Sequence, residues 1–167
     1  MQKRVFQILA DNTSGVLSRI SGLFSRRGYN IESITAGVTA NPKITRITIV
    51  ACGDEDILSQ IEKQVAKLVD VRDIKELKPE ESVYRELCLV KVRTSEEKRQ
   101  TISTIADIFR AKIVDISPDS ITIEITGNQS KITALLAMLS EYEILELART
   151  GIVGLGRGSE GVVYINE

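Results

Sequence analysis

The order of predicted strands and helices in the first 78 residues recurs in the rest of the chain, and this repetition constrains the fold more than any other feature. In the first half, β-rich runs alternate with segments whose apolar residues recur at helical spacing. The predicted elements are a strand over 3–10, a helix with the apolar stripe Val16, Leu17, Ile20, Leu23 and Phe24, strands over 29–39 and 44–52, a helix with Ile57, Leu58, Ile61, Val65 and Leu68, and a strand over 71–77. The order is β-α-β-β-α-β.

The second half repeats this order after a polar joint, residues 78–82, that contains a proline. Its predicted elements are a strand over 84–93, a helix with Ile102, Ile105, Ala106 and Phe109, strands over 111–117 and 121–126, a helix with Ile132, Leu135, Leu136 and Leu139, and a strand over 143–149. A β-α-β-β-α-β unit forms an antiparallel four-stranded sheet with both helices on one face. We therefore predict an α+β protein of two tandem ferredoxin-like domains, residues 1–78 and 83–167.

The face of the first sheet that carries no helices is expected to be partly covered. In the strand over 44–52, Ile47 and Ile49 lie on one phase and Val50 on the other, so apolar side chains point to both faces. A partner subunit or the sister domain is the expected cover.

Composition excludes several classes of function. The chain has no histidine, which removes Ser-His and Cys-His catalytic arrangements. Its two cysteines, Cys52 and Cys88, lie in apolar runs without a C-x-x-C pair, so we expect buried thiols and no transition-metal site. Residues 1–78 carry twelve Lys and Arg against nine Asp and Glu, and residues 79–167 carry ten against fourteen. Neither half has the basic excess typical of nucleic-acid binding.

The hydrophobic pattern predicts neither a membrane segment nor a secretory signal. Apolar runs reach about eight residues, well below the ~20 that a transmembrane helix needs. The apolar start of the chain is interrupted at Asp11 and Asn12, unlike a signal peptide. The expected location is the cytoplasm.

The junction between the first strand and the first helix could bind the charged end of an amino acid. Gly15 would let a ligand approach the backbone, and the N–H groups of Gly15, Val16 and Leu17 lie at the positive end of the helix, where a carboxylate fits. Asn12 adds an amide that can accept from an ammonium group, and Asn30 could present a second polar group from the next strand. Because Asn, Ser and Gly before a helix are also ordinary capping residues, a purely structural role is the alternative.

Two segments, LADNTSGVLSRI at 9–20 and FSRRGYNIES at 24–33, resemble the ACT domain, a small-molecule-sensing version of this fold. The sequence is most similar to the regulatory small subunits of acetolactate synthase, also called acetohydroxyacid synthase, the first common enzyme of valine, leucine and isoleucine synthesis. The similarity continues through 69–71, 85–92 and 150–158 and covers essentially the whole chain.

This resemblance implies a regulatory subunit of a transferase, with no catalytic residues of its own. Residues 1–78 would form the sensing ACT domain and a homodimer, and residues 83–167 would serve assembly and contact with a separate catalytic subunit. Valine or a related amino acid would give feedback inhibition, and the chain would also activate the catalytic subunit. Thiamine diphosphate, magnesium and FAD are expected on that subunit, and no cofactor or metal on this chain.

The resemblance also implies an effector site at an interface between two ACT domains. In this family the effector is held by residues that match Asn12, Gly15, Val16, Asn30 and Ile31. Candidates for its apolar wall are Leu9, Val38 and again Ile31, for which core packing is the alternative, and Leu17 is a further candidate for effector contact. Because one methylene changes affinity by only about 1–3 kcal/mol, the choice among branched-chain amino acids stays open.

Three other functions share some of these sequence features. An ACT-type regulator of a different enzyme is the nearest alternative. An RNA-recognition motif has the same element order but needs aromatic residues on its central strands, and the strand over 44–52 has none. A stand-alone enzyme is the third alternative, although the charged runs fit helix starts and solvated faces better than a catalytic site.

The glycine-rich segment at 154–158 superficially resembles a phosphate-binding loop. It lacks the lysine–hydroxyl pair and leaves too few residues for the helix that would receive the phosphate. A mobile tail is expected here, and the family resemblance adds the hypothesis that this end is ordered or used when the catalytic subunit binds.

Overall fold

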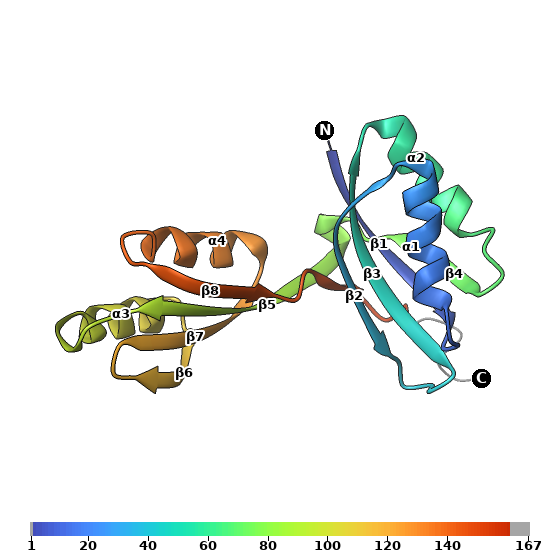
Figure 1. The fold of residues 1–167 in the computed structure, drawn as a ribbon. Helices are drawn as coiled ribbons and strands as arrows, with labels where there is room; N and C mark the ends of the chain where they lie inside the picture. The colour runs from blue at the N-terminus through green and yellow to red at the C-terminus, as the bar shows by residue number, and fades with distance from the viewer. Residues whose placement is uncertain (1, 161–167) are drawn as a thin grey trace. The chain divides into compact units, whose positions relative to one another are not determined.

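The computed structural model describes residues 2–160, so that 161–167, which the predicted second domain includes, lie outside the described part. Two compact units make up the chain (Figure 1). Unit 1 comprises Met1–Tyr84 together with the segment that begins at Ile152, and unit 2 comprises Arg85–Gly151. Among the described residues the longest helix has 13 residues, and none is long and apolar enough to span a membrane.

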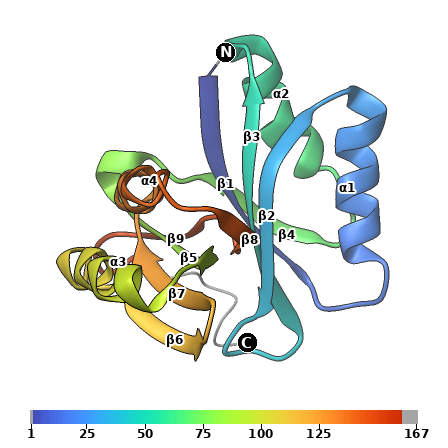
Figure 2. The same cartoon turned by 60° about the vertical axis from the view of Figure 1, so that its left-hand side comes forward.

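Unit 1 has the predicted β-α-β-β-α-β order. Its elements are β1 (Gln2–Asp11), α1 (Val16–Arg27), β2 (Asn30–Val38), β3 (Ile44–Gly53), α2 (Glu55–Val65) and β4 (Val71–Glu76). The strands form an antiparallel sheet in the order β2-β3-β1-β4, and both helices cover one face of it (Figure 2). The predicted fold class is confirmed.

The core of unit 1 lies between the helices and this sheet face. Alternate residues of β1 and β3, such as Phe6, Ile8, Ile47 and Ile49, meet the apolar stripes of α1 and α2 there. The second helix is capped by an acidic side chain, since Asp54 accepts a hydrogen bond from the N–H of Ile57 at 2.9 Å.

Unit 2 repeats the plan with α3 and α4 on one face of its sheet. Its elements are β5 (Ser82–Arg93), which begins within unit 1, α3 (Glu96–Ile108), β6 (Lys112–Ser117), β7 (Ser120–Gly127), α4 (Gln129–Met138) and β8 (Ile144–Arg149). The strand order is β6-β7-β5-β8, and the antiparallel pairs follow the same scheme as in unit 1.

The segment that follows unit 2 returns to unit 1, and here the predicted boundaries differ from the structure. The prediction places residues 152–160 in the second domain, but Ile152 is buried in a cluster with Val5, Val50 and Leu77. Val5 and Val50 lie on the sheet face opposite the helices. This face is partly covered, as expected, but the cover in the structure is the chain's own C-terminal segment, which belongs to unit 1, whereas a partner subunit or the sister domain was predicted.

The expectation of a mobile tail is wrong for the start of the glycine-rich segment. Val153–Gly156 forms a ninth strand, β9, which pairs with β5. Gly154 lets it approach closely, because a Cβ at this position would lie 2.9 Å from Leu77 Cδ1. Two side chains of unit 1 donate to backbone carbonyl oxygens of this segment: Thr35 Oγ1 to that of Ile152 at 3.1 Å, just before β9, and Arg46 Nη2 to that of Gly154 at 2.6 Å.

Both cysteines are buried free thiols, as predicted. Burial raises the pKa of Cys52 and of Cys88, and Cys52 Sγ also donates to Glu32 Oε2 at 3.3 Å.

Candidate functional site

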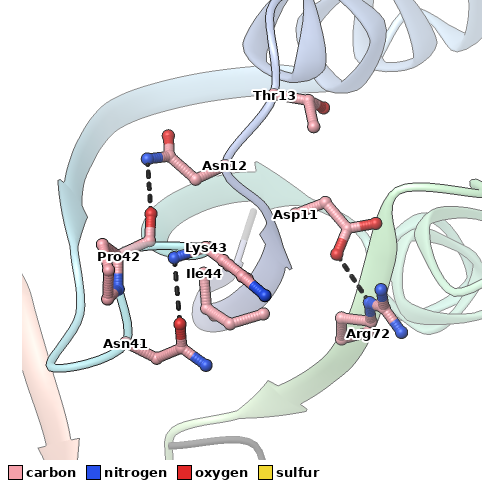
Figure 3. Close-up of a pocket in the computed structure, with 8 residues that line it drawn as sticks. All are labelled: Asp11, Asn12, Thr13, Asn41, Pro42, Lys43, Ile44 and Arg72. Carbon is pink, nitrogen blue, oxygen red and sulfur yellow. Dashed lines mark hydrogen bonds and ion pairs between the residues drawn. The ribbon is translucent and has the colours of Figure 1, made fainter. Parts of the chain in front are cut away.

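The predicted site at the start of the first helix lies beside the turn between β2 and β3 (Figure 3). β1 ends at Asp11, α1 begins at Val16, and the turn leads from Val38 to Ile44. A pocket of about 450 Å³ opens between the end of β1 and the turn. The pocket is lined by Asp11, Asn12, Thr13, Asn41, Pro42, Lys43, Ile44 and Arg72.

Asn12 is held in this pocket by the turn. Its backbone N–H donates to the carbonyl oxygen of Lys43 at 2.7 Å, and its side-chain Nδ2 donates to that of Pro42 at 2.9 Å. The oxygen of the amide is turned away from the turn (Figure 3), and no described residue donates to it. Asn12 therefore offers an acceptor to an external donor such as an ammonium group.

The start of α1 keeps backbone donors that no side chain caps. Gly15 occupies the N-cap position with φ of 85°, a left-handed conformation that glycine adopts without strain. The N–H of Val16 makes only a long hydrogen bond of 3.4 Å, to Thr13, and the N–H of Leu17 has no acceptor among the described residues. The capping alternative is therefore wrong for Asn12, and the positive end of the helix can receive an anion.

Arg19 lies against Gly15, which sequence reasoning missed. A Cβ built on Gly15 would lie 2.9 Å from Arg19 Nη1, so the guanidinium occupies the space that any other residue would fill. Arg19 Nη2 also donates to the carbonyl oxygen of Ser14 at 3.4 Å. The signal was available, because residues 15 and 19 are four apart and share one face of the helix start.

Two ion pairs lie in or beside this region. Arg72 Nε binds Asp11 at 2.7 Å at the edge of the pocket, and Arg19 binds Asp70. Within residues 2–160, no three His, Cys, Asp or Glu side chains are placed to hold one metal ion. The pocket therefore presents neutral polar groups, the Asp11–Arg72 ion pair and the cationic side chain of Lys43.

Asn30 and Ile31 lie at the other end of the sheet. In the sheet, Asn30 pairs with Cys52 of β3, whereas Asp11 pairs with Ile44 of the same strand. These two partners are eight residues apart along β3. At 3.3 Å per residue the separation is about 26 Å. Ile31 packs partly buried against the core. A single chain therefore does not bring these two residues together with Asn12.

The remaining predicted residues have different surroundings. The Val16 side chain is part of the core, so only its backbone is available to a ligand. Leu9 is 1% exposed and shares the phase of Val5, on the sheet face opposite α1, so it does not form a wall beside Asn12. Leu17 is exposed on α1, and Val38, 59% exposed, is level with Thr45, at the same end of the sheet as the pocket.

Two family models match the chain, one on each half. Residues 6–73 match an acetohydroxyacid synthase small subunit-like ACT domain. Residues 85–158 match a model described as the small subunit of acetolactate synthase. The second match extends through β9.

Curated and solved relatives cover nearly the full length. A probable acetolactate synthase small subunit of Methanothermobacter thermautotrophicus is 49% identical over 156 residues, 93% of each chain. The acetolactate synthase isozyme 3 small subunit of Escherichia coli is 45% identical over 95% of this chain and 98% of its own. The crystal structure of the Thermotoga maritima acetolactate synthase small subunit superimposes with a TM-score of 0.88, at 40% identity, over 96% of this chain and all of that one. The chain therefore belongs to the family of acetolactate synthase small subunits.

Proposed function

We propose that this chain senses valine or a related branched-chain amino acid and transmits the signal to the catalytic subunit of acetolactate synthase. The free chain would activate that subunit, and the effector-bound chain would give feedback inhibition. Full-length similarity to acetolactate synthase small subunits supports the enzyme partner. The observation that carries the sensing role is the uncapped start of α1 beside the outward-facing oxygen of Asn12.

These two features match the two charged groups of a free amino acid. The carboxylate would accept hydrogen bonds from the backbone at Gly15 and Leu17, with the guanidinium of Arg19 alongside. The ammonium group would donate to Asn12 Oδ1. Neither interaction needs a cofactor, and we propose that the catalytic cofactors belong to the large subunit.

The separation of Asn30 and Ile31 from Asn12 supports a site shared by two copies. β2 is an edge strand of the described sheet, and two copies could pair there in antiparallel fashion. Pairing centred on Ile34 would place Asn30 of one copy opposite Val38 of the other. It would also cover Ile34 and Val38, which are 40% and 59% exposed. The predicted homodimer and the effector site are then one structural unit.

A substitution at Gly15 tests the site. Gly15→Asp is expected to abolish valine inhibition, because its carboxylate would bind Arg19 and occupy the place of the effector carboxylate, while activation of the catalytic subunit persists. Gly15→Asn is the matched control: it has the same shape, tolerates positive φ and carries no charge.

Two measurements decide the outcome. Calorimetric titration of the chain with valine, leucine and isoleucine should show saturable binding at the two symmetry-equivalent sites of the ACT dimer interface, and enzyme assays should show the inhibition. Valine inhibition that persists in Gly15→Asp would refute the site. Loss of equal size in Gly15→Asn would mean that backbone strain, and not charge, is responsible.

A further inference from the structure

We propose that the turn between β2 and β3 orients Asn12 and thereby makes the effector site selective for an ammonium group. The residues responsible are Asn41, Pro42 and Lys43, none of which would need to touch the effector. This proposal rests on the proposed function and concerns how the same site distinguishes an amino acid from an analogue without its amino group.

The orientation of a terminal amide is not set by its own torsion. The two flipped orientations of an asparagine amide are close in energy when neither end has a partner. Asn12 is on the surface, and water would satisfy either orientation. The hydrogen bond from Nδ2 to Pro42 fixes the nitrogen on the side of the turn, and the oxygen then faces outward (Figure 3).

The turn that supplies this acceptor is itself fixed by hydrogen bonds. The side-chain Oδ1 of Asn41 accepts from the N–H of Lys43 at 3.0 Å, which closes a local turn around Pro42. The carbonyl oxygen of Asn41 accepts from the N–H of Ile44 at 3.0 Å. The second anchor is the backbone bond from Asn12 to Lys43, which holds the turn against the end of β1.

The orientation of the Asn12 amide decides whether the ligand meets its oxygen or its NH₂ group. An outward oxygen attracts an ammonium group, whereas an outward NH₂ group repels it and can donate to a hydroxyl oxygen instead. A turn that no longer holds Nδ2 would let both orientations occur. Affinity for the amino acid should then fall, while affinity for its hydroxy analogue should change little.

The test compares two ligands on the full-length chain. Valine and 2-hydroxy-3-methylbutanoate share a carbon skeleton and a carboxylate, and differ only in ammonium against hydroxyl. In Asn41→Ala, which removes the acceptor for Lys43 N–H, the Kd for valine is expected to rise about five-fold, the size of one ordinary hydrogen bond. The Kd for the hydroxy acid should change by less than about two-fold.

Two further variants separate orientation from general damage. Asn41→Asp keeps an acceptor for Lys43 N–H and should retain the valine affinity. Asn128→Ala is the matched control, because Asn128 Oδ1 accepts from the N–H of Lys131 at 2.9 Å in the same manner, at the start of α4 in unit 2. It should leave both Kd values unchanged.

The outcomes are distinguishable. Equal losses for both ligands in Asn41→Ala, or no loss for valine, would overturn the orienting role and leave the effector site intact. If the unmodified chain binds neither ligand, the proposed function itself fails.

Discussion

The two units share one topology but differ on the sheet face that carries no helices. In unit 1, β3 is buried along almost its whole length on both faces, because the C-terminal segment covers the second one. In unit 2, β7 alternates between buried and partly exposed residues, and the neighbouring strands carry the ion pair Lys91–Glu146, at 2.8 Å, on the open face. Topology therefore does not decide what a sheet face contacts; the residues on its outer phase do.

One arginine in each unit binds buried or partly buried acceptors, and the two arginines have different partners. Arg46 in unit 1 donates to neutral acceptors, Gln7 Oε1 and the carbonyl oxygen of Gly154, both at 2.6 Å, and its burial lowers the pKa of its guanidinium. Arg149 in unit 2 binds both carboxylate oxygens of Glu86, at 2.7 and 2.9 Å. The Glu86 side chain is 3% exposed.

The largest expected effect is the loss of the charged partner in unit 2. Arg149→Met should destabilise the chain by about 3 kcal/mol, because the buried carboxylate of Glu86 loses its counterion. Arg46→Met should cost about 1–2 kcal/mol, since the acceptors left behind are neutral. Denaturant unfolding gives the losses, and hydrogen exchange assigns them to a unit.

An exposed ion pair provides the control. Lys91→Met removes only the surface pair with Glu146 and should cost less than about 1 kcal/mol. A cost at Arg46 equal to or larger than that at Arg149 would break the proposed difference between the two arginines.

The second prediction tests the cover on unit 1. Gly154→Val should cost about 2 kcal/mol, since its Cβ would meet Leu77 and lie 3.1 Å from Tyr84 Cδ1. Gly156→Val, in the same strand, has nothing within 4 Å of its Cβ and should change stability by less than about 0.5 kcal/mol. Thermal unfolding compares the pair. Equal effects of the two substitutions would show that β9 does not pack as described.

The smallest expected effect concerns the ends of the first helix in each unit. In α1, Gly28 takes φ of 67° and Tyr29 N–H bonds back to Phe24 at 2.9 Å; in α3, Arg110 takes φ of 54° and Ala111 bonds back to Ala106 at 2.9 Å. The two ends are equivalent Schellman motifs, one with glycine and one without.

Exchanging the two residues should therefore have opposite effects. Arg110→Gly should stabilise unit 2 by about 0.5–1 kcal/mol, and Gly28→Arg should destabilise unit 1 by about 1 kcal/mol, because only glycine adopts this conformation without strain. Melting temperatures measure both. Effects of the same sign would contradict this account.

The sequence pattern predicted the elements because periodicity reports which faces are buried. The apolar residues on both phases of β3 correctly indicated that the second face of the unit 1 sheet is covered. The identity of the cover was missed in part, because a segment rich in glycine, such as 154–158, is typical of flexible tails. At Gly154 the absent side chain instead permits close packing against Leu77.

The candidate site was predictable only where it is local in sequence. Asn12 and Gly15 are three residues apart, and their joint position at the start of α1 follows from the strand-to-helix junction. Asn30 was expected near them, but β2 begins where α1 ends, which places it at the far end of the ladder. The turn holds Asn12 through a hydrogen bond to Pro42, a residue 30 positions later in the sequence. No local sequence pattern indicates such a contact.

The return of the chain to unit 1 at Ile152 has a consequence for biosynthesis. The bonds from Thr35 to Ile152 and from Arg46 to Gly154 join residues 117 and 108 positions apart. During translation at about 5–20 residues per second, the amino-terminal sheet must therefore wait several seconds before the segment that begins at Ile152 emerges to pack on Val5 and Val50. A nascent chain in this interval offers an apolar surface to chaperones, and a ribosome stalled before codon 152 would leave it uncovered.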